Sequence, residues 1–145
     1  MSLANLIWGF MAKILVIDDE QSIRDLLEKL LRREGYEVML AESGWEGLEL
    51  FCQERPEVVV LDLNMSGIEG LTALQQVRRL NPDQRVIILT GAGTPEKEQE
   101  VRELGVTEYI EKETSLHLIG DSLRRLLKNP DLSFLEGGHQ ERGAR

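Results

Sequence analysis

The chain has 145 residues, a length typical of one domain and sufficient to bury a core without disulfides. Its single cysteine, Cys52, excludes an internal disulfide and a cysteine-rich zinc site, which indicates a reducing compartment. The 17 Lys and Arg residues against 26 Asp and Glu residues give a net charge of −9 and no basic stripe, so direct nucleic-acid binding is not expected.

Residues 3–11 (LANLIWGFM) are apolar, but a membrane-spanning helix needs about 20 such residues, so no membrane span is expected. No Lys or Arg precedes this segment and no small-residue cleavage site follows it, which argues against a signal peptide. We interpret residues 1–11 either as a short leader or as an apolar arm, carrying Trp8 and Phe10, that docks on its own or a neighbouring domain.

From Lys13 onward, short apolar runs alternate five times with longer amphipathic stretches, which is typical of βα units. The apolar runs are continuous, as in strands that are buried on both faces of a parallel sheet. The right-handed crossover rule places helices on both faces, so the predicted fold class is α/β, a doubly wound parallel sheet. The predicted strands cover residues 14–17, 36–40, 58–61, 86–89 and 106–110.

Apolar residues at helical spacing predict the helices between these strands. Gly35 is expected to end the first helix, and the pair Asn81-Pro82 to end the third. The fourth helix, over 95–104, is highly charged and is expected to be the least firmly anchored. The predicted core positions are Ile23, Leu26, Leu27, Leu30 and Leu31 in the first helix; Leu71, Leu74, Val77 and Leu80 in the third; Val101 and Leu104 in the fourth; and Leu116, Ile119, Leu123, Leu126 and Leu127 in the fifth.

The second helix is predicted from a capping box, in which Ser43 precedes Glu46 by three positions. Its buried face is expected to comprise Trp45, Leu48, Phe51 and Cys52. This placement makes Cys52 an inert core thiol in the sequence-based interpretation.

Residues with reactive side chains follow four of the predicted strands, where they would meet at the carboxyl edge of the sheet. These residues are Asp18, Asp19, Asp62, Thr90 and Lys112. Clustered carboxylates repel one another unless a hard cation such as Mg²⁺ lies among them, and a carboxylate can act as a nucleophile toward phosphorus. Each residue alone has a structural explanation as a turn, cap or surface residue. Together they predict a phosphoryl-transfer site.

Over residues 13–128 the sequence resembles the CheY-like receiver domain of two-component response regulators. The matching segments are 14–20 (ILVIDDE), 58–65 (VVVLDLNM) with Gly70, 87–90 (IILT) and 105–112 (GVTEYIEK). The resemblance implies a (βα)5 flavodoxin-like fold with a five-stranded parallel sheet in the order 2-1-3-4-5. It divides the chain into an apolar leader (1–11), a receiver domain (12–128) and a flexible tail or linker (129–145).

The resemblance also implies that Asp62 is the phosphoacceptor. Asp18, Asp19, Asp62 and the backbone carbonyl of Asn64 would then hold Mg²⁺.

Three further residues match positions that respond to the phosphoryl group in the family. Lys112 would pair with its oxygens, Thr90 would swing inward to bind it, and Tyr109 would follow the threonine as the switch aromatic. The output surface would be the face formed by the fourth helix, fifth strand and fifth helix, through which a homodimer is also expected.

A protein with these residues would be a cytoplasmic phosphoprotein and not an enzyme that turns over a metabolite. It would catalyse its own phosphorylation and dephosphorylation. Its expected partners are a sensor histidine kinase or phosphotransfer protein and a downstream protein target.

The sequence departs from the family pattern at two positions. Glu113 stands where a proline usually follows the lysine, and a non-proline cis bond costs about 2.5–4 kcal/mol. We therefore expect a trans bond in a somewhat different loop, or a strained cis bond. Ser66 stands where a proline often follows the methionine. Asn64 and Ala92 occupy variable positions that are expected to tune hydrolysis.

The sequence gives weaker support to three other functions. A degenerate receiver would act by protein contact alone, although all five expected functional groups are present. A small aspartyl-phosphate phosphatase using Asp62 would need a cap or a long specificity loop, whereas every strand-to-helix connection here is short. A nucleotide- or flavin-binding module is disfavoured because no glycine-rich phosphate loop follows the first strand.

Overall fold

The structure is a computed structural model that describes residues 12–65, 69–91, 95–105, 108–112 and 116–128. Strands and helices alternate along the chain, as the sequence predicts. The strands are β1 (Lys13–Ile17), β2 (Glu37–Ala41), β3 (Val58–Asp62), β4 (Arg85–Thr90) and β5 (Glu108–Glu111). The helices are α2 (Gln21–Arg33), α3 (Gly44–Glu54), α4 (Glu69–Leu80), α5 (Pro95–Glu103) and α6 (Leu116–Lys128).

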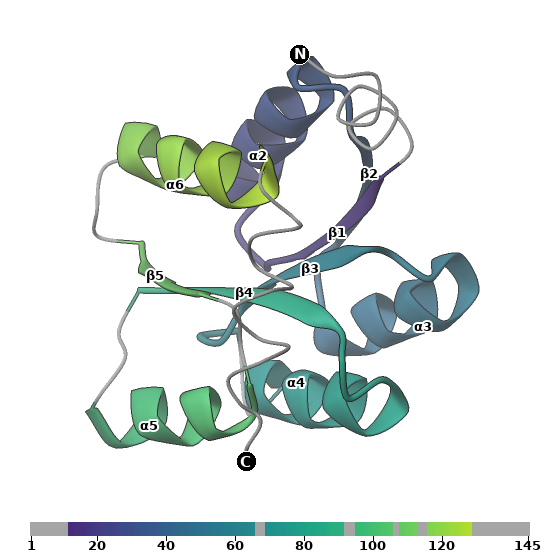
Figure 1. Ribbon diagram of the computed structural model, residues 1–145, viewed down its shortest axis with the longest axis vertical. Coiled ribbons are helices and arrows are strands. Elements are labelled where there is room, and N and C mark those ends of the chain that lie inside the picture. The colour runs from purple at the N-terminus through teal and green to yellow at the C-terminus, as the bar shows by residue number, and fades with distance from the viewer. Residues whose placement is uncertain (1–11, 66–68, 92–94, 106–107, 113–115, 129–145) are drawn as a thin grey trace.

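The five strands form one parallel sheet in the order β2-β1-β3-β4-β5, which confirms the predicted fold (Figure 1). Strand β1, the second in this order, pairs with both of its neighbours: Leu15 lies opposite Met39 on β2 and Val59 on β3. The chain therefore reverses its direction of winding between β2 and β3. A parallel sheet with such a switch point presents its ligand site at the carboxyl ends of the strands.

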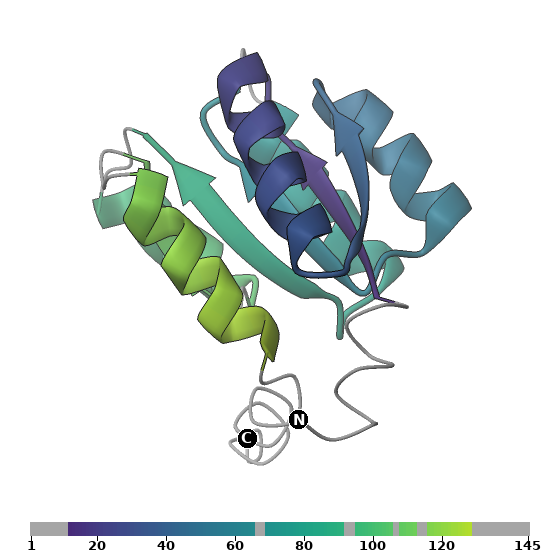
Figure 2. The ribbon, with the colours of Figure 1, turned by 90° about the horizontal axis from the view of Figure 1, so that it is seen from above.

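Helices cover both faces of the sheet and enclose two apolar cores. Helices α2 and α6 lie on one face, and α3, α4 and α5 lie on the other (Figures 1 and 2). Alternate residues of β1 enter different cores, because successive side chains of a strand point to opposite faces. Ile14 and Val16 pack in the first core, whereas Leu15 and Ile17 pack in the second.

Helix α2 follows its predicted face closely. Its buried residues are Ile23, Leu27 and Leu31, one residue per turn. Gly35 ends the helix as predicted: its φ is 98°, and its amide donates to the carbonyl of Arg32. This left-handed conformation is one that glycine adopts without the cost a Cβ would add.

The predicted buried face of α3 is wrong at two positions. Phe51 is buried, but Trp45 is 66% exposed and Cys52 is exposed. The helix turns Gly47 toward the sheet, so closely that a Cβ there would lie 2.4 Å from Cδ1 of Ile17. Trp45 and Cys52 are seven positions apart and therefore lie on the same side of the helix. This side points away from the sheet, because the side with Gly47 faces it.

The cap of α3 forms where the sequence predicts it. The hydroxyl of Ser43 accepts a hydrogen bond from the amide of Glu46. The carboxylate of Glu46 accepts a hydrogen bond from the amide of Glu42. In the usual capping box the carboxylate accepts from the amide of the N-cap residue, which here is Ser43.

Helix α4 buries Leu74 and Val77 as predicted, but the prediction that Leu80 is buried is wrong. Leu80 is 56% exposed and is the last residue of the helix. Arg78 holds the connection that follows. Its guanidinium donates to the carbonyl oxygens of Asn81, Pro82 and Gln84.

Helix α5 has one buried residue, Val101, in agreement with its predicted weak anchoring. Arg78 also secures the end of this helix, because it donates to the carbonyls of Leu104 and Gly105 at 2.6 Å and 3.2 Å. Five backbone carbonyls from two segments, residues 81–84 and 104–105, thus converge on one guanidinium, which carries five N–H donors.

Helix α6 buries Ile119, Leu123 and Leu127 as predicted. No described helix is both long enough and apolar enough to cross a membrane. Several sequence predictions lie outside the described residues: those for the leader (1–11), the tail (129–145), Ser66, Ala92 and the Lys112–Glu113 bond.

Candidate phosphoryl-transfer site

Four of the residues predicted for the site come together at the carboxyl edge of the sheet. Asp62 is the last residue of β3 and Thr90 the last of β4, while Asp18 follows β1 and Lys112 follows β5. These four strands are neighbours, so their ends line up in space. The amide of Lys112 donates to the carbonyl of Thr90 at 2.7 Å, which continues the β4–β5 pairing to the edge of the site.

Lys112 is the centre of the cluster. Its ammonium nitrogen lies 2.9 Å from Oδ2 of Asp18 and 3.1 Å from Oδ2 of Asp62. It also contacts Oε1 of Glu20 at 2.5 Å. The side chains of both aspartates are 1% exposed and that of Lys112 is 10% exposed. One buried cation thus bridges two buried carboxylates and one that is half-exposed.

Local turns aim the two aspartates. Oδ1 of Asp18 accepts from the amide of Glu20 at 2.9 Å, and Oδ1 of Asp62 accepts from the amide of Asn64 at 2.8 Å. A carboxylate that caps the amide two residues later is fixed in direction by its own backbone. Lys112 donates to Oδ2 of Asp62 at 3.1 Å, whereas its hydrogen bond to Asp18 goes to Oδ1 at 3.2 Å, the oxygen that also accepts from Glu20.

Gly70 allows the backbone after Asp62 to pack against the start of α4. A Cβ on Gly70 would lie 2.6 Å from the carbonyl oxygen of Leu63 and 2.8 Å from that of Asp62. Real side chains do not approach backbone so closely. The glycine at this position thus sets the path of the chain around Asp62.

Burial and charge shift two ionisations in the cluster. Burial raises the pKa of Asp18 to about 6, and the negative charge of Asp62 adds to this effect, while hydrogen bonds from Glu20 and Lys112 partly oppose it. Burial by itself lowers the pKa of Lys112, but its hydrogen bonds to Glu20 and Asp18 and the charges of Asp18 and Asp62 raise it above its ordinary value. Lys112 therefore remains an ammonium ion at neutral pH.

The oxygen donors fit a hard divalent cation. Among the described residues, Asp18, Glu20 and Asp62 each offer a carboxylate oxygen, and these oxygens lie within 4.8 Å of one another. Oδ2 of Asp18 is buried and accepts no hydrogen bond of normal geometry from the described residues, although Lys112 is within ion-pair distance. Oxygen ligands and an unsatisfied buried carboxylate oxygen suit Mg²⁺.

The structure adds Glu20 to the set that the sequence predicts. Asp19, the predicted ligand, is exposed, and its carboxylate does not belong to this group of three. Glu20 is not among the residues that the sequence predicts for the site. The acidic run Asp18-Asp19-Glu20 is the sequence signal that could have identified Glu20. The turn at Asp18 determines whether the side chain of Asp19 or that of Glu20 faces the cluster, and the sequence does not show this turn.

The hydroxyls of Thr90 and Tyr109 are both buried and have no hydrogen-bond partner among the described residues. Burial raises the pKa of Tyr109, with Glu98 and Glu111 adding to the effect. Its ring packs against the second core, and the guanidinium of Arg102 on α5 lies 5.6 Å from the ring centroid. A buried hydroxyl without a partner is costly, so each of these groups would gain by a move that gives it one.

Comparison with known proteins agrees with the geometry. The family model described as "Response regulator receiver domain" matches residues 14–124. Sporulation initiation phosphotransferase F of Bacillus subtilis (strain 168) is 34% identical over 115 residues, covering 79% of this chain and 93% of that protein. Response regulator MprA of Mycobacterium sp. (strain KMS) is 32% identical over 133 residues, covering 86% of this chain but 58% of that protein. The chain spans about half the length of this regulator and of others that it matches.

Solved structures give the same result. A response regulator receiver domain protein (CheY-like) from Methanospirillum hungatei JF-1 has a TM-score of 0.76 and 28% identity, covering 88% of this chain and 99% of that chain. Chemotaxis response regulator CheY4 of Vibrio cholerae has a TM-score of 0.71 and 32% identity, covering 80% of this chain and 98% of that chain.

Proposed function

Because the chain belongs to the response regulator receiver domain family, we propose that it is a switch that accepts a phosphoryl group on Asp62 and then changes its protein-binding face. Receiver domains of this family act in the phosphorylation-dependent signalling of two-component systems. The observation that carries the proposal is the contact of the Lys112 ammonium with both Asp18 and Asp62 at the carboxyl edge of the sheet. A buried carboxylate beside a fixed cation and further acids is suited to phosphoryl transfer.

In the proposed transfer, a carboxylate oxygen of Asp62 attacks the phosphorus of a phosphohistidine on a sensor histidine kinase or phosphotransfer protein. An O–P bond forms, the P–N bond breaks, and the imidazole that leaves takes a proton. Lys112 pairs with the phosphoryl oxygens, because it already lies beside Oδ2 of Asp62. Water later cleaves the O–P bond, so the chain catalyses its own phosphorylation and dephosphorylation and is not an enzyme acting on a metabolite.

Asp18, Asp19, Asp62 and the backbone carbonyl of Asn64 are proposed to hold Mg²⁺. The metal, when bound, supplies positive charge that offsets the charge on the phosphoryl oxygens. The carboxylate cluster supports a cation at this place, and Glu20 is a further oxygen donor beside it.

Thr90 and Tyr109 are proposed to carry the signal away from Asp62. The buried hydroxyl of Thr90 has no partner among the described residues, and a phosphoryl oxygen on Asp62 would supply one. Movement of Thr90 would leave space that the ring of Tyr109, which is only partly buried, can enter.

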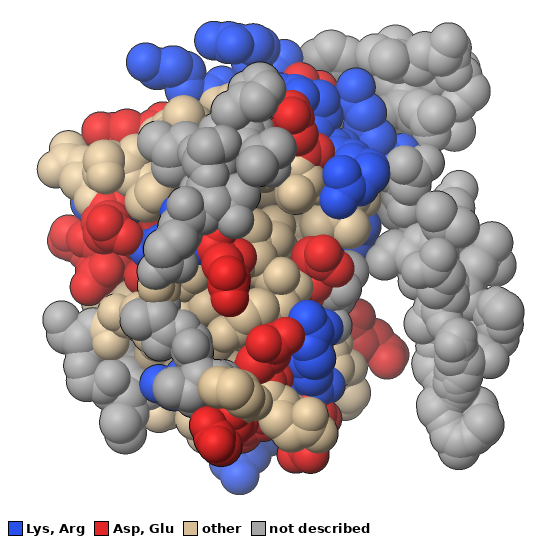
Figure 3. Space-filling model, turned by 90° about the vertical axis from the view of Figure 1, so that its left-hand side faces the viewer, with Lys and Arg blue, Asp and Glu red and all other residues tan. Residues whose placement is uncertain are grey.

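The proposed output surface is the face formed by α5, β5 and α6. Acidic and basic side chains are interspersed on that side of the molecule (Figure 3). This mixed pattern supports a protein partner or a second copy of the chain rather than a nucleic acid. A homodimer through this face predicts that sedimentation gives twice the monomer mass once a phosphoryl mimic is bound. A monomer mass with and without the mimic would exclude it.

The proposed domain boundaries are a leader (1–11), the receiver (12–128) and a tail or linker (129–145). The strand that begins at Lys13 and the helix that ends at Lys128 support the receiver limits. The single cysteine and the family support a cytoplasmic location.

Intact-mass measurement tests the proposed function. The chain is incubated with phosphoramidate, a small P–N donor, and Mg²⁺. We expect one phosphoryl adduct that disappears in Asp62→Asn or with a chelator and persists in Asp83→Asn, which changes an exposed aspartate outside the site. No adduct from this donor or from a phosphorylated histidine kinase, in a chain with native circular dichroism, would favour the degenerate receiver that acts by contact alone.

A further inference from the structure

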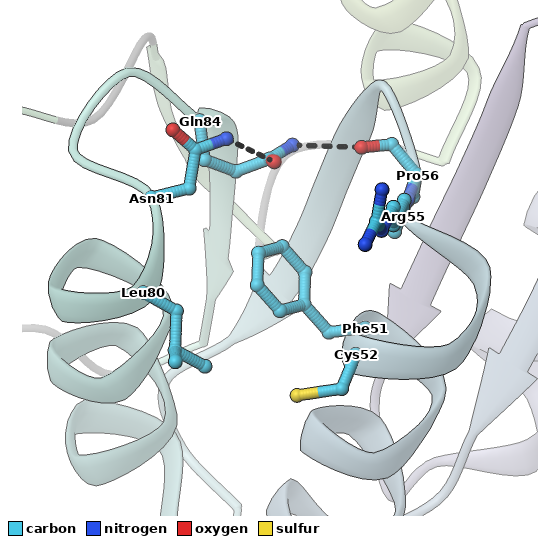
Figure 4. Close-up of a pocket in the computed structure, with 7 residues that line it drawn as sticks. All are labelled: Phe51, Cys52, Arg55, Pro56, Leu80, Asn81 and Gln84. Carbon is cyan, nitrogen blue, oxygen red and sulfur yellow. Dashed lines mark hydrogen bonds between the residues drawn. The ribbon is translucent and has the colours of Figure 1, made fainter.

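A pocket of about 480 Å³ opens between the ends of α3 and α4, away from the carboxyl edge that carries the site. Phe51, Pro56 and Leu80 form its apolar part, and Cys52 and Leu80 face one another across it (Figure 4). Its volume lies in the range of about 300–1,000 Å³ that is typical of ligand pockets. The proposed function makes no use of this pocket.

The residues that line this α3–α4 pocket favour a neutral, apolar occupant. Gln84 donates to the carbonyls of Pro56 and Glu57 and accepts from the side-chain amide of Asn81, so the polar wall is already hydrogen-bonded (Figure 4). Arg55 is the only charged side chain among its lining residues. A charged ligand would find no buried counter-charge here.

Exposed apolar side chains gather on the two helices that form the pocket. Leu80 on α4 and Trp45 on α3 are the large hydrophobic side chains found exposed among the described residues. Trp45 lies two turns before Cys52 on the same side of α3. Leu80 lines the pocket and Trp45 lies outside it, so a segment that fills the pocket and continues along α3 could cover both exposed apolar side chains.

The beginning of β1 lies beside the segment that forms part of the pocket wall. The amide of Lys13 donates to the carboxylate of Glu57 at 2.6 Å, and the amide of Glu57 donates to the carbonyl of Lys13 at 2.9 Å. The ammonium of Lys13 pairs with Glu54 at 3.4 Å. The chain therefore joins the sheet beside the α3–β3 connection, which supplies Arg55 and Pro56 to the pocket wall.

The chemistry of residues 3–11 matches the pocket. The segment LANLIWGFM contains no charged side chain and two aromatic ones. Phe10 and Trp8 stand three and five residues before Lys13, so an extended chain carries them about 10 Å and 17 Å from it. The tail is the less suitable occupant: it contains Asp131 and Glu136, and it follows α6, which lies on the opposite face of the sheet (Figure 2).

We propose that the apolar leader (residues 3–11) folds back onto its own chain and inserts Trp8 or Phe10 into the α3–α4 pocket between Cys52 and Leu80. The leader thus covers the pocket and buries part of the exposed apolar surface of α3 and α4. The proposal does not depend on phosphorylation, because the pocket shares no residue with the Asp62 site.

The single cysteine of the chain provides a direct test, because Cys52 lines the pocket and any thiol reaction reports on that position alone. The rate of alkylation by N-ethylmaleimide is measured for the full chain and for a variant without residues 2–11. We expect deletion to accelerate alkylation at least about tenfold, as expected when a covering segment is removed. A peptide of residues 2–11 added to the shortened chain should slow the reaction again. Alkylation in concentrated urea, where the pocket is lost, should be equal for both chains.

Side-chain variants keep the test valid if the deletion disturbs folding. Trp8→Ser with Phe10→Ser in the full chain should accelerate alkylation as the deletion does, and Leu80→Ser should also do so. Deletion of residues 130–145 is the matched control and should leave the rate unchanged.

Three results would overturn the proposal. Equal rates with and without the leader would show that it does not cover Cys52. Acceleration on deletion of the tail alone would assign the pocket to the tail. Protection that fades on dilution, together with a dimer mass in sedimentation, would assign it to the leader of a second copy.

Discussion

The ammonium nitrogen of Lys112 lies 2.9 Å from Oδ2 of Asp18, although the two residues are 94 positions apart in the chain. The same nitrogen lies 3.1 Å from Oδ2 of Asp62. A single side chain at the end of β5 thus offsets the repulsion between acids that follow β1 and end β3.

Replacement of Lys112 by Ala should destabilise the metal-free protein more than the metal-bound protein. Without the ammonium, Asp18 and Asp62 are left as buried charges without a counter-ion, which costs about 3–5 kcal/mol. Mg²⁺ can supply part of the missing charge. Urea unfolding of the variant with EDTA and with Mg²⁺ measures the difference. An equal loss of unfolding free energy in both buffers would contradict this role of Lys112.

Asp18 should make the metal-free protein less stable as pH rises from about 4 to about 6. Burial raises its pKa in the folded state to about 6 from an ordinary value of 3.8, so the folded state binds the proton more tightly than the unfolded state. The stabilisation is complete below pH 4 and is lost as pH passes 6. A shift of this size corresponds to at most about 3 kcal/mol.

The Asp18→Asn variant isolates this contribution. The unfolding free energies of the wild-type chain and of Asp18→Asn are measured with EDTA between pH 4 and pH 6. As the pH rises, the wild-type chain should lose stability relative to Asp18→Asn. A difference that stays constant over this range would mean that the pKa of Asp18 is the same in the folded and unfolded states.

Asp19 and Glu20 should differ in their effect on Mg²⁺ affinity. We expect Asp19→Asn to weaken Mg²⁺ binding by about 10-fold or more, since the proposed ligand is lost. Glu20→Gln should weaken it less, because the carboxylate of Glu20 already contacts Lys112 at 2.5 Å and must leave that contact to bind metal. Isothermal titration calorimetry compares the two. A larger effect at Glu20 would make Glu20 the ligand in place of Asp19.

Gly47→Ala should destabilise the fold by about 1–3 kcal/mol, in spite of the better helix propensity of alanine. The added Cβ would lie 2.4 Å from Cδ1 of Ile17, in the middle of the second core. Ile17→Val removes that carbon atom. In a double-mutant cycle followed by urea unfolding, the combined variant should lose less than the sum of the two single losses. Strict additivity would show that the helix moves away from the sheet instead.

Arg78→Lys should loosen α5 more than the rest of the protein. Lysine has three donors, whereas the guanidinium of Arg78 serves five carbonyls, including Leu104 and Gly105 at the end of α5. Amide hydrogen exchange over 95–104 should accelerate by about tenfold, while β1 and β3 change little. Arg79→Lys, one position later and exposed, is the control and should have no such effect.

Most of the fold could be predicted because the apolar pattern and the topology agree. Runs such as 58–61 are apolar at every position, and only a strand covered on both faces accepts such a run. The helices were predicted correctly where their buried positions repeat at i, i+4 and i+8, as Ile23, Leu27 and Leu31 do.

The prediction failed on α3 because glycine has no hydropathy signal of its own. Trp45 and Cys52 are apolar in type, but the side of the helix that approaches the sheet is the one with Gly47, where no side chain intervenes. Close approach of two backbones is a property of the packed pair, and the sequence of one helix does not contain it.

The reactive residues of the site could be predicted because they follow strands. The contacts of Glu20 and of Arg78 could not be predicted. Glu20 reaches Lys112 across 92 positions, and this depends on the turn that Asp18 makes. Arg78 is bonded to backbone carbonyls, which every residue carries, so no pattern of side chains identifies its partners.

The arrangement of Lys112 after the last strand has a consequence for synthesis on the ribosome. Asp62 is made 50 residues before Lys112, which at about 5–20 residues per second is an interval of about 3–10 s. During this interval β1, β2 and β3 can already pair, but their acidic ends have no lysine between them. A nascent chain that stops before β5 therefore exposes an unbalanced acidic edge, and charge neutrality at that edge arrives only with the final βα unit.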